Sequence, residues 1–486
     1  MPTLAVSRVA ADQAFSRAAG APLVPGNAVR LLKDAAENYP AWLAAIDAAE
    51  RYIHFEMYIL HDDEIGGRFA EALVARARAG VRVRLVYDWL GALGATSRQF
   101  WYQLVDAGVD VRGFNPPRLT RPLAWLVRDH RKMLAVDGRV AFVSGLCVGD
   151  AWMGRDGVDP WRDTGVEIRG PAVADVHGEF AEIWAATGDP LPDDEVPEHG
   201  AGDEAGTVAL RVVGTRPAGA GMLRLDNLVA ALARERLWIT DAYFVAMPGY
   251  VQALTAAAAD GVDVRLLVPG GSDLPLVRSL SRAGYRGLLE GGVRVFEWNG
   301  SMVHAKTAVA DARWARVGST NLNLQSWIGN WELDVAIEDL GFGAAMESMF
   351  DRDLGNATEV LLARRRRAPA HPAPPGAGAD GVAPDEPPSA GGRRRWPPRR
   401  RRGGGSTSRA AAASLRFGNT MGAALTSTRH LGAAEAWVLA AGGLLLLAVA
   451  GVAALWPAVV AYPAAAVAAW LGAALAGAAW RARHPR

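Results

Sequence analysis

The sequence predicts an α/β protein made of two copies of one fold, followed by a helical membrane hairpin. Three observations lead to this prediction. Strand-like and helix-like segments alternate through residues 25–362, their order is repeated, and two long apolar runs lie near the end of the chain. A chain of 486 residues is also too long for one compact domain, so two or three domains are expected.

The first copy is predicted at residues 25–200. Residues 51–60 (RYIHFEMYIL) are rich in β-branched and aromatic side chains, which is typical of a strand. Residues 65–80 (IGGRFAEALVARARAG) have a helical pattern and lead into a second strand-like run at residues 81–90 (VRVRLVYDWL). The order strand, helix, strand follows.

The second copy is predicted at residues 205–362. The segments RLWITDAYFV, YVQALTAAAADG and VDVRLLVPGG repeat the order of the first copy, and LLEGGVRVFEWN repeats LVDAGVDVRGFN. Several matches in one order indicate an internal duplication. Because strands alternate with helices, we expect an α/β sandwich in each copy, mostly parallel strands, and a pseudo-twofold relation between the copies.

The ends of the chain have other compositions. Residues 1–24 form an N-terminal extension without the pattern of a cleavable signal peptide, and residues 363–410 read as a disordered linker rich in proline, glycine and arginine. In the C-terminal region 411–486, two apolar runs at 437–456 and 458–480 are long enough to cross a hydrocarbon core of roughly 30 Å. An alanine-rich soluble hairpin is the alternative.

Arginine clusters on both sides of the two apolar runs predict the side of the membrane. Positive residues favour the cytoplasmic face, so we expect a protein of the inner cell membrane with its catalytic domains in the cytoplasm. The single cysteine, Cys147, excludes an intramolecular disulfide framework. The net charge of +1 excludes little, because the basic residues are clustered.

A short motif, H-x-K-x4-D, occurs once in each copy. HRKMLAVD begins at His130, and HAKTAVAD begins 174 residues later at His304. On a strand alternate side chains share a face, so His130 and Lys132 point the same way, as do His304 and Lys306. A pseudo-twofold axis would bring both pairs into one site.

These residue types favour chemistry on a phosphate ester. A lysine two residues from a histidine repels a metal dication, and no usual metal-ligand spacing is found, so no metal or other cofactor is expected. Lysines neutralise phosphoryl oxygens, whereas imidazoles act as nucleophile and as general acid and base.

The two motifs resemble the paired signatures of the phospholipase D superfamily. The stretch GSTNL, at residues 318–322, matches an element that usually follows, and FEMYIL, GVRVRLVYDWLG and WRDTGVEIRGPAV resemble the bacterial cardiolipin synthase branch. The resemblance covers nearly all of residues 25–362. It implies that one histidine attacks phosphorus to form a phosphohistidine, while the other protonates the leaving alcohol and then deprotonates the incoming one.

The resemblance also implies roles for individual residues. By analogy His130 is the nucleophile, although the sequence itself does not decide between the two histidines. Aligning WRDTGVEI with NWELDVAI pairs Asp163 with Glu332, and these are the candidates for the carboxylates that orient the histidines. Asp137 and Asp311 complete the motif, and we expect them to tie down the turn that follows each strand. The candidates for holding the phosphoryl oxygens are Lys132, Lys306, Ser144, Ser319 and Asn321.

One residue departs from the family pattern. Cys147 stands where the second copy has Asn321, and a thiol cannot replace the amide as a hydrogen-bond donor. This places the phosphate contact of the first copy in doubt, and the favoured interpretation is that Cys147 is simply a small buried residue. Ser144 and backbone N–H groups would then compensate.

The predicted function is a phosphatidyltransferase of the cardiolipin synthase type. It would move a phosphatidyl group, expected to come from phosphatidylglycerol, to the glycerol hydroxyl of a second phospholipid. The expected partners are phospholipids and an anionic membrane surface, without nucleic acid and without an obligate protein partner. A phospholipase D that hydrolyses the intermediate, and an inactive lipid-binding scaffold, are the alternatives.

The segment before His130 has two interpretations. Its composition is typical of a membrane interface, and it is equally typical of a core helix with arginines on its solvent-exposed face. The residues concerned are Arg118, Arg121, Trp125 and Arg128.

Overall fold

The computed structural model describes residues 12–117, 126–155, 157–200 and 202–362, together with six isolated residues between 451 and 470. The predicted linker lies outside the described residues, as do Arg118, Arg121 and Trp125 and all but six residues of the predicted membrane spans. Within the described part of the chain, no helix is long and apolar enough to cross a membrane.

The first copy follows the predicted order of segments. Its helix α3, for example, begins after Asp63, whose side chain accepts a hydrogen bond from the N–H of Gly66 at 2.9 Å, as in an N-cap. The elements are β1 (Val24–Lys33), α2 (Asp34–Asp47), β2 (Tyr52–Met57), α3 (Glu64–Arg78), β3 (Arg82–Asp88), α4 (Arg98–Asp106), β4 (Asp110–Phe114), β5 (Lys132–Val136), β6 (Val140–Ser144), α5 (Asp150–Met153), β7 (Thr164–Arg169) and α6 (Val173–Thr187).

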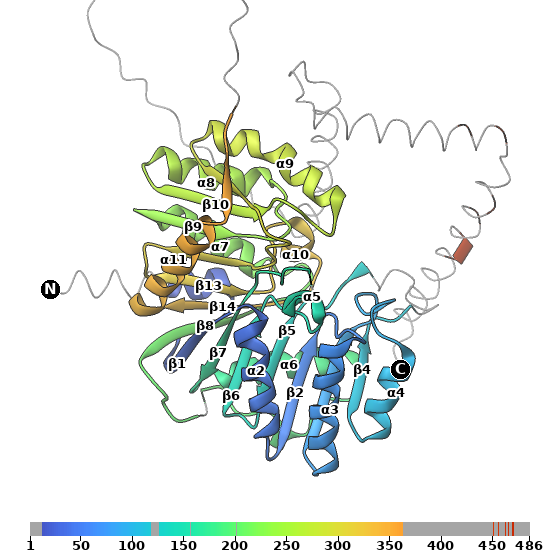
Figure 1. Ribbon diagram of the computed structural model, residues 1–486. Coiled ribbons are helices and arrows are strands. Elements are labelled where there is room, and N and C mark those ends of the chain that lie inside the picture. Colours follow the sequence, from blue (N-terminus) through green and yellow to red (C-terminus); the bar gives the residue numbers. More distant parts are fainter. Residues whose placement is uncertain are drawn as a thin grey trace, which may run out of the picture. The chain divides into compact units, whose positions relative to one another are not determined.

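The second copy repeats this order after the short 3-10 helix η2 (Asp193–Glu195). Figure 1 shows it in green to orange beside the first copy in blue to teal. Its elements are β8 (Val208–Thr215), α7 (Gly221–Leu232), β9 (Arg236–Thr240), α8 (Pro248–Ala259), β10 (Asp263–Pro269), α9 (Pro275–Glu290), β11 (Arg294–Trp298), β12 (Thr307–Ala310), β13 (Trp314–Gly318), α10 (Leu324–Ile328), β14 (Glu332–Glu338), α11 (Leu340–Leu354) and β15 (Ala357–Val360).

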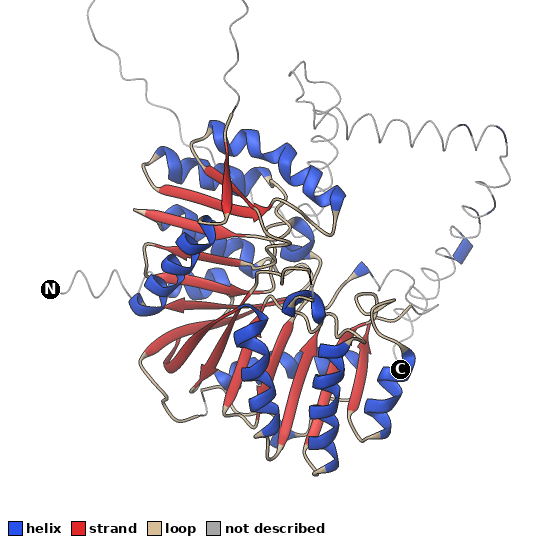
Figure 2. Ribbon diagram, viewed as in Figure 1, coloured by secondary structure: helices blue, strands red, loops and turns tan. Residues whose placement is uncertain are grey.

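All of these strands form one sheet, with helices on both of its faces (Figure 2). The strand order is β15-β11-β10-β9-β12-β13-β14-β8-β1-β7-β6-β5-β2-β3-β4. Apart from the edge strand β15, the order in one copy mirrors the order in the other across the pair β8 and β1. These two strands pair antiparallel, with Val24 opposite Leu210. The mirrored order is the pseudo-twofold relation that the sequence predicts.

The prediction of mostly parallel strands is wrong. In the first copy only the β2–β3 and β3–β4 pairs are parallel, whereas β2–β5, β5–β6, β6–β7 and β1–β7 are antiparallel. The reason lies in the connections: β5 and β6 are separated by three residues, and so short a turn can join only antiparallel neighbours. The prediction extended the helical crossovers of residues 52–114 to strands that have none.

The hydrophobic core explains why the two copies stay together. Alternate residues of β5 face opposite sides: Met133 and Ala135 join a cluster shared by both copies, while Leu134 and Val136 join a cluster of the first copy alone. The shared cluster contains side chains of α6 and α11 and of strands from both halves of the sheet. A third cluster belongs almost entirely to the second copy.

Candidate active site

The two histidines of the motifs lie just before strands β5 and β12, which begin at Lys132 and Thr307. Each histidine is held by the main chain of the other copy. The N–H of His130 donates to the carbonyl oxygen of Trp331 at 2.9 Å, and the N–H of His304 donates to that of Arg162 at 2.7 Å. The fold therefore fixes each histidine from across the pseudo-twofold axis.

The two predicted orienting carboxylates lie against the histidines in a crossed arrangement. Oε2 of Glu332 is 2.8 Å from Nδ1 of His130, and Oδ2 of Asp163 is 2.7 Å from Nδ1 of His304. Each imidazole is therefore paired with a carboxylate from the other copy. A carboxylate at Nδ1 favours the tautomer with its proton there, which leaves the lone pair of Nε2 for chemistry.

The carboxylates are themselves held by neighbouring donors. Ser319 donates to Oε2 of Glu332 at 2.6 Å, and Asn330 donates to Oε1 at 3.1 Å. In the first copy the indole N–H of Trp152 donates to Oδ2 of Asp163 at 3.0 Å. Such partners fix the direction of a carboxylate, so the geometry of both histidines depends on this outer layer of contacts.

The two lysines lie beside the histidines of their own motifs. Lys132 donates to the carbonyl oxygen of His130, and Lys306 donates to that of His304, with Nζ of Lys306 also 3.1 Å from Nε2 of His304. Both lysines are buried. Burial lowers the pKa of Lys132, and it lowers the pKa of Lys306 to about 8.

Charge connects the four residues into one centre. Burial, Lys132 and Lys306 lower the pKa of His130 well below its ordinary value. Burial and Lys306 lower the pKa of His304 to about 4, and Lys132 contributes to the same shift. Both lysines thus act on both histidines, and both imidazoles are neutral at pH 7. A neutral imidazole with a free lone pair is the form that acts as nucleophile or base.

The two carboxylates differ in their protonation. Burial raises the pKa of Glu332 to about 7, against the opposite effect of Lys132. Burial alone would also raise the pKa of Asp163, but His304 and Lys306 outweigh it and hold that pKa below its ordinary value. The pairs of the two copies are therefore chemically unequal at neutral pH.

The remaining phosphate-binding candidates lie at the last residue of β6 and in the turn after β13. The hydroxyl of Ser144 accepts from the N–H of Leu146 at 3.2 Å, whereas that of Ser319 is used on Glu332. Asn321 is 4% exposed, and its Oδ1 has no hydrogen-bond partner among the described residues. Cys147 is buried, and the nearby Lys132 and Lys306 oppose the burial that raises the pKa of its thiol.

The motif aspartates lie at the opposite ends of their strands from the lysines. The prediction was that they hold the turn that follows their own strand. They hold instead the turn before the neighbouring strand. The cause is that β5 runs antiparallel to β2, with Ile53 opposite Val136, so the end of β5 meets the beginning of β2. The carboxylate of Asp137 accepts from the N–H groups of Glu50, Arg51 and Tyr52, and that of Asp311 from those of Arg234, Glu235 and Arg236, at 2.7–2.9 Å.

The structure places next to the histidines aromatic side chains that were not predicted from the sequence as site residues. The ring of Tyr58 lies 4.8 Å from that of His130, and the ring of Tyr243 lies 5.6 Å from that of His304. The two tyrosines occupy the same position in FEMYIL and TDAYFV, so the repeat held a signal for both. Trp152 and Trp161 also lie within about 5.5 Å of the His304 ring. The repeat marks Trp152, which has in AWMG the place of Trp327 in SWIG, but it does not mark Trp161.

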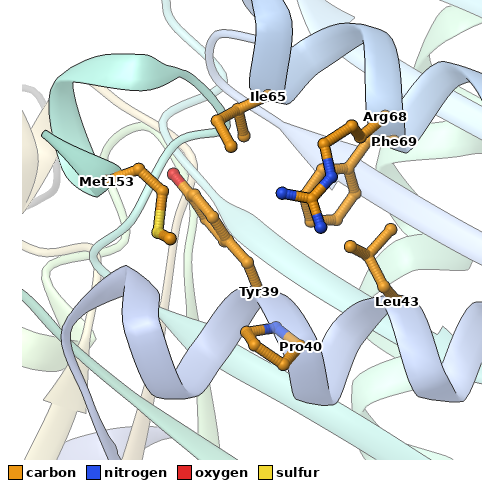
Figure 3. Close-up of a pocket in the computed structure, with 7 residues that line it drawn as sticks. All are labelled: Tyr39, Pro40, Leu43, Ile65, Arg68, Phe69 and Met153. Atoms are coloured by element: carbon orange, nitrogen blue, oxygen red, sulfur yellow. The ribbon is translucent and has the colours of Figure 1, made fainter. Parts of the chain in front are cut away.

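A small cavity lies between α2, α3 and α5, and neither histidine is among its lining residues (Figure 3). Its volume of about 40 Å³ is close to that of a single water molecule in the liquid, so it is too small for a lipid. Tyr39, one of its walls, donates its hydroxyl to the carbonyl oxygen of Cys147 at 2.7 Å. The cavity lining is Tyr39, Pro40, Leu43, Ile65, Arg68, Phe69 and Met153.

Comparison with known proteins gives concordant results. Residues 42–184 and 229–354 match the family model described as "Cardiolipin synthase, PLD-like domain". The chain is 34% identical to cardiolipin synthase A of Pseudomonas aeruginosa, over 73% of this chain and 72% of that protein. It is 30% identical to the cardiolipin synthase of Alkalihalophilus pseudofirmus, over 72% of this chain and 70% of that protein.

A solved structure has the same fold. The crystal structure of phosphatidylserine synthase from Haemophilus influenzae superposes with a TM-score of 0.57 at 14% identity, covering 72% of this chain and 91% of that one. The two matched segments of the family model coincide with the two copies described above, which places the histidine motifs inside both segments.

Proposed function

The chain belongs to the phospholipase D-like family of cardiolipin synthases, and we propose that its centre transfers phosphatidyl groups through a phosphohistidine. It is a phosphatidyltransferase of the cardiolipin synthase type. The observation that carries the proposal is the crossed pairing of His130 with Glu332 and of His304 with Asp163, beside two buried lysines. That arrangement supplies two activated imidazoles and positive charge for one phosphodiester.

In the first step Nε2 of His130 forms a bond to phosphorus while the bond from phosphorus to the headgroup oxygen breaks. The imidazolium form of His304, a minor form at pH 7 whose charge Asp163 balances, supplies the proton that this oxygen needs and becomes neutral. Glu332 stabilises the charged imidazole of His130. Lys132 and Lys306 neutralise the phosphoryl oxygens, which carry the developing charge. Asn321 supports them only through its amide nitrogen, which donates to Ser326 at 3.5 Å in the structure, because its buried amide oxygen only accepts hydrogen bonds.

In the second step the roles reverse. His304 takes the proton from the glycerol hydroxyl of a second lipid, the hydroxyl oxygen attacks phosphorus, and the bond between phosphorus and His130 breaks. Phosphatidylglycerol as both donor and acceptor gives cardiolipin and free glycerol. Exclusion of water from the buried centre favours this transfer over hydrolysis, because water would otherwise compete for the same intermediate.

The test is lipid analysis of a host that lacks cardiolipin. Cells would express the wild-type chain, His130→Ala, His304→Ala, or the control His199→Ala, which removes an exposed histidine outside the centre. Cardiolipin from the wild type and the control alone supports the proposal. Phosphatidic acid in its place identifies a hydrolase, and lipids that do not depend on either histidine point to a scaffold.

We propose further that the chain works at an anionic membrane and is anchored in it by residues 437–456 and 458–480, with its catalytic copies in the cytoplasm. The arginine clusters before these runs support it, since basic residues gain roughly 1 kcal/mol each near an anionic surface. Deleting residues 437–480 should release the chain from carbonate-washed membranes. Protease added to intact and opened vesicles then reports the side on which residues 12–362 lie.

A further inference from the structure

The two tyrosines beside the histidines occupy equivalent places in the two copies. Each ring faces the histidine of its own motif and the ammonium group of its lysine. Nζ of Lys132 is 4.9 Å from the centre of the Tyr58 ring, and Nζ of Lys306 is 5.5 Å from the centre of the Tyr243 ring. The duplication therefore builds the same wall on both sides of the centre.

The hydroxyl groups of these tyrosines have partners of opposite charge. On the His130 side, Arg128 donates from Nη2 to the hydroxyl oxygen of Tyr58 at 2.7 Å. On the His304 side, the hydroxyl of Tyr243 donates to the carboxylate of Asp273 at 2.9 and 3.1 Å. Ser272 also donates to Asp273 at 3.3 Å, so the carboxylate is held from two directions.

These partners decide which hydrogen bonds a ligand can make on each side. The proton of Tyr243 is used on Asp273, and burial with Asp273 raises the pKa of Tyr243 well above its ordinary value, so the hydroxyl stays protonated. What remains on the His304 side is the phenolic oxygen and a carboxylate, which only accept. Tyr58 accepts from Arg128 and keeps its own proton, so the His130 side offers a hydroxyl donor. The guanidinium beside it is paired with the carboxylate of Asp88 at 2.7 and 3.0 Å.

Aromatic rings add to the difference between the sides. The ring of Trp161 lies 5.5 Å from that of His304 and is tilted by 34°, and it is part-exposed, whereas His130 has only Tyr58 among its ring contacts within the described residues. Aromatic faces beside a carboxylate are favourable for an ammonium group and for the carbon side of a polyol.

We propose that the His304 side binds the alcohol headgroup and that Asp273 is the residue that selects it, by accepting hydrogen bonds from a hydroxyl or ammonium group. This rests on the proposed function. A leaving alcohol departs on the face of phosphorus opposite the attacking nitrogen. An alcohol site at His304 therefore makes His304 the proton donor to the departing oxygen and His130 the residue that bonds to phosphorus. The donor-bearing His130 side faces the oxygens of the phosphatidyl group.

The experiment uses the full chain in micelles of phosphatidylglycerol with a fluorescent acyl chain and one of three added alcohols. The alcohols 1-propanol, ethylene glycol and ethanolamine match in heavy-atom number and differ in their far end, which is a methyl, hydroxyl or ammonium group. Products are separated by chromatography and compared as ratios to the 1-propanol product. The variants are Asp273→Asn, Tyr243→Phe, His130→Ala, and Asp62→Asn as a control at an exposed aspartate of the first copy.

The wild type and Asp62→Asn should prefer ethanolamine and ethylene glycol to 1-propanol. Asp273→Asn should lower the ethanolamine ratio at least about tenfold, as expected for a lost charge-assisted hydrogen bond. Tyr243→Phe removes the hydrogen bond from the Tyr243 hydroxyl to Asp273, and it should lower the ethanolamine ratio less than Asp273→Asn does. Histidine-dependent products with ratios unchanged in Asp273→Asn would overturn the headgroup site alone. Products equal in wild type and His130→Ala would instead refute the proposed function.

Discussion

At the residue scale, the two copies fit carboxylates of different length beside equivalent strands. A Cβ atom at Gly145 would lie 2.3 Å from Oδ1 of Asp163, so the first copy needs glycine there. The second copy has Ser319 at the same place, where its hydroxyl donates to the longer Glu332. The shorter Asp163 is thus paired with Gly145, and Glu332, which is longer by one methylene group, is paired with Ser319.

Gly145→Ala should therefore weaken catalysis without reaching the substrate. The added methyl group displaces Asp163 from His304, and a misplacement of this kind costs roughly 10- to 100-fold in kcat. Gly178→Ala in α6 is the matched control, because a Cβ there meets nothing within 4 Å. Transfer rates of the purified variants check the prediction, and equal rates for both would show that Asp163 tolerates the displacement.

The raised pKa of Glu332, about 7, predicts the pH dependence of transfer. Only the ionised carboxylate accepts the Nδ1 proton of His130, whereas the acid form of His304 is lost above its pKa of about 4. Because the gain in ionised Glu332 offsets the loss of protonated His304 only up to about pH 7, kcat should be nearly constant from pH 5 to 7 and fall above 7. Glu332→Gln should lose this inflection and about 10³-fold or more of kcat, since an amide favours the wrong tautomer. Rates measured from pH 5 to 9 for the wild type and Glu332→Gln test this assignment. A change of slope near pH 7 that persists in Glu332→Gln would belong to a group other than Glu332.

The buried lysine of the second motif should destabilise the fold. The pKa of Lys306, about 8, is below that of an unfolded lysine, so the unfolded chain binds more protons between about pH 8 and 10.5. The cost of the buried charge is fully present below pH 8 and fades as pH rises toward 10.5. It amounts to up to about 3 kcal/mol, from the size of the shift.

Lys306→Met should accordingly raise the free energy of unfolding at pH 7 while it abolishes transfer. The gain should shrink at pH 10. Lys33→Met is the control, because Lys33 is the chain's remaining lysine and is partly exposed. Denaturant unfolding at both pH values measures this, and a destabilised Lys306→Met would mean that the ion pairs of Lys306 outweigh its burial.

At the element scale, the motif aspartates connect strands rather than assist chemistry. Each carboxylate collects three N–H groups of the chain that enters β2 or β9. Asp137→Ala leaves these groups without their acceptor, which should cost about 2–4 kcal/mol of stability. Transfer by the folded variant at low temperature should fall far less than in His130→Ala, which loses the nucleophile.

Calorimetry with Asp62→Ala as the control measures the loss of stability, and transfer assays of the same samples measure the chemistry. A stable Asp137→Ala that transfers as poorly as His130→Ala would return this aspartate to the catalytic residues.

The sequence predicts most elements but not their pairing. The segments around β2, α3 and β3 and their repeats around β9, α8 and β10 follow from local patterns of apolar residues. Mostly parallel strands were predicted, whereas β5 to β7 pair antiparallel, because pairing depends on the turn between strands and not on the strands themselves. Asp163 and Glu332 were found by aligning the copies, yet which histidine each would meet depends on contacts between the copies.

At the scale of the whole molecule, the copies share one core and should unfold together. Side chains of both copies meet in a single buried cluster, so neither keeps its apolar surface covered alone. Asp311→Ala, in the second copy, should increase hydrogen exchange in β5 of the first as much as in β12. Mass spectrometry of deuterium uptake measures both strands, and exchange that rises in β12 alone would identify two independent folding units.

The crossed carboxylates also bear on how such a chain could arise. A protein with a single copy would hold a histidine without the acid that orients it, and two identical chains would have to associate before either could react. In that ancestor every substitution would appear on both sides at once. Fusion of two genes into one reading frame removes this constraint. Only after fusion could the two halves diverge, so that one has Glu332 with Ser319 and the other has Asp163 with Gly145.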